Sequence, residues 1–155
     1  MYFNTKYFKL SIYKNKHLNW KFLETIKDID NVIDIGAAEG TMSLVYNFPK
    51  ANYYLFEPLK LFNQKLTAFN KNNKITNYEI FNVALSDKVG EMEFNYFKEA
   101  PISSSLNNPN DYWEGKKKES VSKVKVKVDK LSNYKSRINF QNCLIKIDTQ
   151  GNEFE

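Results

Sequence analysis

Short apolar runs and amphipathic segments alternate along the first half of the chain. Residues 32–36, 53–56 and 78–83 are runs rich in β-branched and aromatic side chains, which is typical of strands buried on both faces. Residues 41–47 and 58–70 carry apolar side chains at helical spacing between these runs. Because parallel strands need long crossover connections, this order predicts a parallel sheet with helices between its strands.

The pattern changes after residue 90. Residues 92–96 and 123–128 alternate apolar and polar side chains, which predicts two half-exposed strands that run antiparallel to each other. A nearly all-apolar run at residues 143–148 predicts a further strand of the parallel sheet, beside the first. The whole pattern predicts an α/β fold of the Rossmann-like kind: a doubly wound, mostly parallel sheet with an antiparallel hairpin insertion.

The predicted elements divide the chain into two parts. Residues 1–30 form an N-terminal extension with a short helix that begins near residue 19, and residues 31–155 form the domain. The chain ends seven residues after the last predicted strand, whereas a fold of this kind continues with a helix and more strands. An uncovered apolar edge strand is unfavourable. We therefore expect the domain to be partial, with its C-terminal strands missing.

Composition narrows the function classes. The net charge of +5 is spread along the 155 residues rather than gathered in one block, so we expect no nucleic-acid partner. One cysteine, Cys143, and one histidine, His17, are too few for a disulfide or a structural zinc site, and we expect no metal. Lysines interrupt the apolar side chains of the first 25 residues, and no run approaches the about 20 apolar residues that cross a bilayer. We therefore expect a soluble, cytoplasmic protein without a membrane partner.

A glycine loop follows the first predicted strand directly. It has the sequence Asp34-Ile-Gly36-Ala37-Ala-Glu39-Gly40 and precedes a predicted helix, whose first N–H groups are free to bind a ligand. The dinucleotide fingerprint G-x-G-x-x-G has its second glycine where this chain has an alanine, and that glycine admits the pyrophosphate. The acidic side chains also suit a cationic amine better than a phosphate. The loop therefore favours S-adenosylmethionine, which has no phosphate, over NAD.

An acidic residue ends the second predicted strand. Glu57, 21 residues after Gly36, stands where a carboxylate can accept hydrogen bonds from both ribose hydroxyls of a nucleotide-linked cofactor. A helix-start carboxylate favoured by the helix dipole is the structural alternative. The glycine loop one strand earlier favours the ligand-binding interpretation.

Five segments, in this order, resemble the successive motifs of FkbM-type methyltransferases. They are residues 32–40 (VIDIGAAEG), 56–58 (FEP), 82–87 (NVALSD), 103–106 (SSSL) and 145–153 (IKIDTQGNE). The resemblance implies a class I methyltransferase fold, S-adenosylmethionine as methyl donor, and methyl transfer to a hydroxyl oxygen of a small molecule or sugar. It places Asp34, Gly36 and Gly40 along the methionine part, Glu57 at the ribose, and Val83 and Ala84 near the adenine. Ala37, Glu39 and Pro58, beside these residues, are further candidate cofactor-binding residues.

Asp148 is the candidate catalytic residue. It ends the strand expected beside the first one, and ligands of open α/β sheets bind in the crevice where the winding reverses. Its carboxylate is suited to position the acceptor or to take the hydroxyl proton. The structural alternative is a turn residue before Gly151.

Three alternatives to an O-methyltransferase stay open. The first is an NAD-dependent oxidoreductase, which shares the sheet and Glu57 but not the glycine spacing. The second is a truncated, non-catalytic cofactor-binding module. The third is an RNA methyltransferase, which only the positive charge suggests and which a salt-dependent RNA affinity would support.

Overall fold

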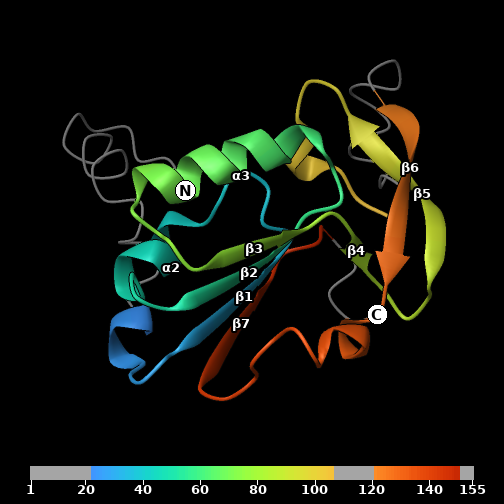
Figure 1. The fold of residues 1–155 in the computed structure, drawn as a ribbon. Coiled ribbons are helices and arrows are strands. Elements are labelled where there is room, and N and C mark those ends of the chain that lie inside the picture. The colour runs from blue at the N-terminus through green and yellow to red at the C-terminus, as the bar shows by residue number, and fades with distance from the viewer. Residues whose placement is uncertain (1–21, 107–120, 151–155) are drawn as a thin grey trace, which may run out of the picture.

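The computed structural model describes residues 22–106 and 121–150, and within them two sheets stand side by side (Figure 1). The larger sheet has four parallel strands in the order β3-β2-β1-β7. Its strands are β1 (Asn31–Ile35), β2 (Asn52–Phe56), β3 (Tyr78–Phe81) and β7 (Cys143–Ile147). Sequence order therefore runs outward from β1 to β3, and β7 returns to the other side of β1. This confirms the predicted parallel sheet and the place of its last strand.

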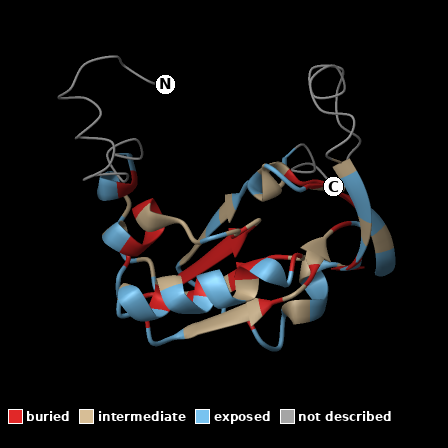
Figure 2. Cartoon of the chain, turned by 90° about the horizontal axis from the view of Figure 1, so that it is seen from above, coloured by how far each residue is buried: buried red, intermediate tan, exposed pale blue. Residues whose placement is uncertain are grey.

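The two α-helices within the described residues lie on one face of the larger sheet. The helices α2 (Met42–Asn47) and α3 (Leu61–Asn72) pack against one face with side chains such as Leu44 and Leu66, which meet Val32 of β1. Figure 2, seen from above, shows buried residues along the strands of the sheet. Burial of large apolar side chains from both elements is the main force that holds these layers together.

The opposite face of this sheet has a different cover. Phe56 and Phe81 stack at 4.6 Å between ring centroids, and Tyr134 meets both rings edge to face. Tyr134 belongs to a 3-10 turn, η4 (Leu131–Tyr134). A doubly wound sheet has helices on both faces, and within the described residues α-helices cover only one. The mixed α/β architecture is thus confirmed, while the complete double winding stays a prediction.

The second sheet is made of β4 (Ala84–Leu85), β6 (Val121–Asp129) and β5 (Gly90–Phe97), in that order. β5 and β6 pair antiparallel, as expected, from Gly90 opposite Val128 to Phe97 opposite Val121. β4 pairs parallel with β6. A further 3-10 turn, η2 (Pro101–Ser103), lies between β5 and β6 in sequence. The insertion is therefore a small sheet of its own rather than a hairpin alone.

Two predicted boundaries were wrong. The strand expected over residues 78–83 stops at Phe81, because Val83 N–H bonds back to the Phe81 carbonyl and turns the chain into β4. The helix expected from Pro58 begins at Leu61. Here the Glu57 carboxylate accepts the Leu59 N–H at 2.8 Å, and this local bond replaces the first turn of helix.

The expected N-terminal helix is only partly within the described residues. A single 3-10 turn spans residues 22–25, and Leu23 in it is buried in the core. Residues 19–21, where the helix was expected to begin, lie outside the described residues. No helix in the described parts of the chain has the length and apolar character to cross a bilayer.

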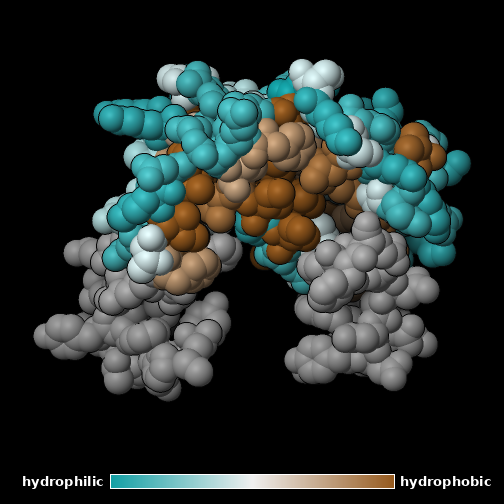
Figure 3. All heavy atoms as spheres, turned by 90° about the horizontal axis from the view of Figure 1, so that it is seen from below, coloured by the Kyte–Doolittle hydropathy of each residue, from teal (hydrophilic) through white to brown (hydrophobic). Residues whose placement is uncertain are grey.

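At the far edge of the larger sheet, β7 has no hydrogen-bonded neighbour on its outer side within the described residues. Ile145 and Ile147 of this strand are 44% and 47% exposed. Figure 3, seen from below, shows apolar side chains gathered in the middle of the face away from α3.

Candidate functional site

The carboxyl ends of three parallel strands meet at one edge of the larger sheet. Ile35 lies in register with Phe56 of β2 on one side and with Ile147 of β7 on the other. The Gly36 N–H then bonds to the Phe56 carbonyl at 3.0 Å, and the Asp148 N–H to the Ile35 carbonyl at 3.0 Å. The loops that follow these strands are therefore held side by side by backbone hydrogen bonds.

Two neighbouring cavities open at this edge. The apolar cavity has about 550 Å³ of empty space, a figure that includes the open solvent at its mouth. Its described lining includes Phe56, Glu57, Pro58, Leu59, Phe62, Val83, Ala84, Phe94, Pro101, Ile102 and Leu106. The polar cavity lies against the glycine loop, and its described lining is Gly36, Ala37, Ala38, Glu39, Gly40, Thr41, Ile102, Lys146, Asp148 and Gln150. The two cavities share five of these residues: Gly36, Ala38, Ile102, Asp148 and Gln150.

Glu57 is a buried carboxylate in the wall of the apolar cavity, with only 5% of its surface exposed. One carboxylate oxygen accepts the Ala38 N–H at 2.9 Å, and the other accepts the Leu59 N–H at 2.8 Å. Burial raises the pKa of Glu57 above its ordinary value, against the opposing effect of the two N–H groups. The same carboxylate thus fixes the glycine loop and the turn before α3.

The glycine loop is shaped by close approaches. Gly36 has φ +73°, and a Cβ at this position would lie 2.1 Å from the backbone oxygen of Asp148. A Cβ on Gly40 would lie 2.4 Å from the Phe69 ring, so this glycine lets the loop pack on α3. Ala38 adopts φ +45°, a left-handed conformation that costs a non-glycine residue about 1–3 kcal/mol. Its bond to Glu57 helps to hold this strained conformation.

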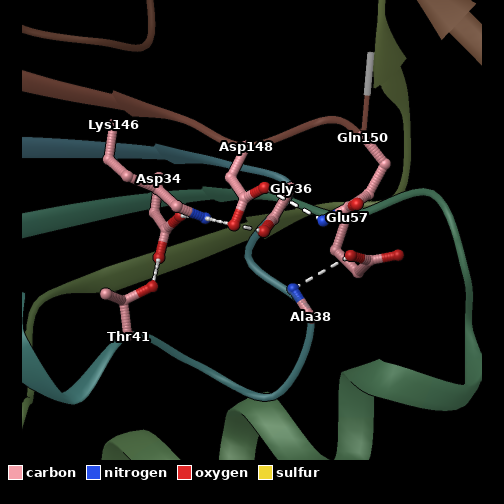
Figure 4. Close-up of polar contacts among 8 residues, drawn as sticks. All are labelled: Asp34, Gly36, Ala38, Thr41, Glu57, Lys146, Asp148 and Gln150. Carbon is pink, nitrogen blue, oxygen red and sulfur yellow. Dashed lines mark hydrogen bonds and ion pairs between the residues drawn. The ribbon is translucent and has the colours of Figure 1, made fainter. Parts of the chain in front are cut away.

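Asp34 lies behind the wall of the polar cavity rather than in it (Figure 4). The side chain is 1% exposed; one oxygen accepts the Thr41 hydroxyl at 2.7 Å, and the other lies 3.0 Å from Lys146 Nζ. Lys146 comes from β7, where it is in register with Asp34. Its ammonium also donates to the Gly36 carbonyl at 3.0 Å.

Asp148 stands where the two cavities join. Figure 4 shows its carboxylate between the Lys146 ammonium, 3.7 Å away, and the Gln150 amide, which donates to it at 3.1 Å. More than half of the side chain is exposed, so the carboxylate is accessible to a ligand. Ser105, beyond η2, donates its hydroxyl to the carbonyls of Thr149 and Gln150 and ties the residues over the apolar cavity to this loop.

The structure brings the sequence-predicted site residues together at this edge. All but Asp34 line a cavity: Gly36, Ala37, Glu39, Gly40 and Asp148 line the polar one, and Gly36, Glu57, Pro58, Val83, Ala84 and Asp148 the apolar one. Glu39 points outward to an ion pair with Lys65, in which both side chains are half exposed. The contacts of the sequence-predicted site residues with a cofactor stay predictions.

Sequence reasoning missed several residues of this site. Lys146 is the most important of them; its signal was a single cation within an otherwise apolar strand. Phe62 and Phe94 belong to the predicted segments 58–70 and 92–96, but nothing in those patterns showed that both line the apolar cavity. No local pattern could have shown that Ile102 reaches both cavities.

Cys143 lies away from this site, and the described residues offer no metal-binding group. Cys143 begins β7, at the opposite end of the strand from Asp148, and burial raises the pKa of its thiol. The described residues contain no group of three or more His, Cys, Asp or Glu side chains placed to hold a metal ion. His17 lies outside the described residues.

Replacing Gly36 with alanine tests the close approach of the two loops. We expect Gly36→Ala to lower the free energy of unfolding by about 1–3 kcal/mol more than Gly90→Ala does, because an overpacked site adds that cost. Gly90 is a matched control: it also has positive φ, +136°, but nothing lies within 4 Å of a Cβ there. Denaturant titration of both variants measures the difference, and equal losses would refute the close approach.

Glu57 gives a pH prediction. Its pKa in the folded chain is raised above the ordinary 4.5, so folded chains keep a proton that unfolded chains lose between these two values. The contribution of this group to the free energy of unfolding is therefore largest below pH 4.5. It falls as the pH rises from 4.5 through the pKa of Glu57 in the folded chain. Carbon-13 NMR titration of the Glu57 carboxyl carbon, assigned by its loss in Glu57→Gln, measures the pKa. A value at or below the ordinary one would contradict the burial of this carboxylate.

Comparison with known proteins identifies the family. A family model described as the methyltransferase FkbM domain matches residues 34–155. No match was found among curated proteins or among solved structures. The matched range begins in β1 and includes the glycine loop, Glu57 and the end of β7. Because the match covers most of the chain and agrees with the motifs in the sequence, the chain belongs to the FkbM methyltransferase family.

Proposed function

We propose that this chain binds S-adenosylmethionine across the two cavities and transfers its methyl group to a hydroxyl oxygen of a small molecule or sugar. Membership of the FkbM methyltransferase family supports methyl transfer in general. The identity of the cofactor and the chemistry of the acceptor are our proposal. They rest on the groups that the cavities present.

The carboxylate of Glu57 carries the proposal. A carboxylate has about four lone-pair sites, and backbone N–H groups use one on each oxygen of Glu57. One site therefore stays available on each oxygen at the wall of the apolar cavity. Two acceptors on one carboxylate match the two neighbouring hydroxyls of a ribose. Pro58, Val83 and Ala84 in the same wall offer apolar contact to an adenine.

The glycine loop favours S-adenosylmethionine over NAD as the cofactor. Ala38 stands where a dinucleotide loop has its second glycine, and its N–H is already bonded to Glu57. Two carboxylates, Asp148 and Glu39, line the polar cavity beside it. This surrounding disfavours a pyrophosphate and suits the cationic, phosphate-free end of S-adenosylmethionine.

The sulfonium of the bound cofactor supplies an activated methyl group, so the protein needs no covalent step of its own. Its task is to hold the acceptor oxygen in line, and such positioning can supply up to about 7–11 kcal/mol of the barrier. Asp148, at the junction of the cavities, is placed to accept a hydrogen bond from the acceptor hydroxyl and take its proton. Ile102 and Leu106 add apolar side chains to the lining of the same cavity.

Ligand-dependent thermal melts test the cofactor. S-Adenosylhomocysteine at 100 times its dissociation constant adds about 2.7 kcal/mol, which raises Tm by roughly 5–10 °C for a domain of this size. We expect that shift with S-adenosylhomocysteine and none with NAD. We also expect Glu57→Gln to lose most of the shift, because the amide offers the ribose one acceptor fewer.

The control for this experiment is Glu91→Gln, which removes an exposed carboxylate of β5 and should keep the full shift. A cooperative melt that S-adenosylhomocysteine does not move would refute the proposed function. A shift with NAD instead would favour an oxidoreductase.

Asp148→Asn tests the catalytic proposal. We expect this variant to bind S-adenosylhomocysteine within about threefold of the unmodified chain and to lose about 10²–10⁴-fold in methyl transfer, as removal of a general base does. The measurement is transfer of labelled methyl from S-adenosylmethionine to a panel of free sugars, alcohols and phenols. Transfer by Asp148→Asn at the full rate would remove Asp148 from the chemistry. Binding by the unmodified chain with no transfer to any acceptor would favour a non-catalytic cofactor-binding module.

A further inference from the structure

Lys146 is a cation in an unusual place. Its side chain is only 10% exposed, although it comes from β7, which is partly exposed and pairs with β1 at the end of the described sheet. Lysine is almost never buried unless it is paired, because removing an ammonium from water is costly. Asp34 supplies the pair at 3.0 Å. The ammonium also lines the polar cavity, where its remaining N–H donors can meet a ligand.

Only part of the hydrogen-bonding capacity of Lys146 is used within the described residues. An ammonium has three N–H donors, and one makes a directed hydrogen bond to the Gly36 carbonyl. The facing oxygen of Asp34 lies 3.0 Å away, within hydrogen-bond distance, and can take a second donor. Asp148 lies at 3.7 Å, beyond hydrogen-bond distance. A ligand can therefore still accept from this ammonium.

The ammonium also faces the right space. Lys146 lines the polar cavity, whereas Asp34 is sealed behind it. Among the described lining residues of this cavity, Lys146 is the one cation; Asp148 is acidic, and the carboxylate of the other acidic residue, Glu39, is paired with Lys65. Without Lys146 this wall would repel any carboxylate. With Lys146 it offers opposite charges a few ångströms apart, which is the pattern that an amino-acid zwitterion requires.

We propose that Lys146 binds the carboxylate of the amino-acid end of the cofactor. This inference rests on the proposed function and adds to it the group that recognises one end of S-adenosylmethionine. Asp34 acts through Lys146: its carboxylate, 3.0 Å away, holds the ammonium at the cavity wall. Lys146 thereby selects cofactors with an amino-acid end over nucleosides that lack the carboxylate.

Two ligands that differ only in the carboxylate test this assignment. S-Adenosylhomocysteine and its decarboxylated analogue share the adenosine, the sulfur and the amine. Isothermal calorimetry on the unmodified chain should show that S-adenosylhomocysteine binds about 10- to 100-fold more tightly, as expected for a charge-assisted hydrogen bond. In Lys146→Gln this ratio should fall to within about threefold of one, because the amide keeps a donor but loses the charge.

Lys125→Gln is the matched control, because Lys125 is an exposed lysine of β6 that lines neither cavity. It should leave the ratio unchanged. Equal weakening of both ligands in Lys146→Gln would show that Lys146 only supports the fold, and would overturn the assignment. If Lys146→Gln does not fold, the unmodified chain still decides, since equal affinity for the two ligands would also overturn it. Failure of the unmodified chain to bind either ligand is a different result, and it would refute the proposed function itself.

Discussion

The position of β1 between β2 and β7 is the constraint on which the rest of the molecule depends. All five residues of β1 are buried, so the strand must be hydrogen-bonded on both sides and covered on both faces. Its in-register pairing with both neighbours brings Gly36, Glu57 and Asp148 to one edge of the sheet. The backbone thus sets this meeting point, and side-chain contacts such as the bond from Ala38 N–H to Glu57 then fix the loops around it.

Charge placement at that edge follows from burial. Asp34 and Glu57 are both nearly inaccessible, and each is compensated differently. Asp34 has a cation beside it, and removing one partner of such a pair costs about 3–5 kcal/mol because the other charge is left buried alone. Glu57 has two N–H groups as partners, and burial raises its pKa although these N–H groups oppose the rise. One carboxylate is thus paired with a cation, and the other is held where it can accept hydrogen bonds.

Much of this architecture could be predicted from the sequence, for an identifiable physical reason. A strand buried on both faces must be apolar throughout, so β1, β2 and β7 were visible as short runs, and the helix α3 was visible from its period. Pro58 was assigned to a helix because proline suits a first turn, but the bond from Leu59 N–H to Glu57 is a tertiary detail that no periodicity encodes. The split of residues 78–85 into β3 and β4 was missed for the same reason.

The contribution of Lys146 shows what a single sequence conceals. Its neighbour Asp34 is 112 residues earlier, and only the register of two parallel strands places them together. The periodicity of a strand predicts which face of the sheet each side chain lies on, but it does not predict the register between strands. The glycine loop and Glu57 were found because their spacing is local, whereas the ion pair beneath the loop depends on the whole sheet.

The hydroxyl of Ser105 has a consequence for how such a site can diversify. It joins the residues over the apolar cavity to the loop after β7 through two carbonyl oxygens, at 3.2 and 2.9 Å from Thr149 and Gln150. Carbonyl acceptors are present whatever side chains stand at those positions. The side chains at positions 149 and 150, which line the apolar cavity, can therefore change without removing these acceptors. The chemistry of that part of the cavity wall is thus separate from the contact that holds the two loops together.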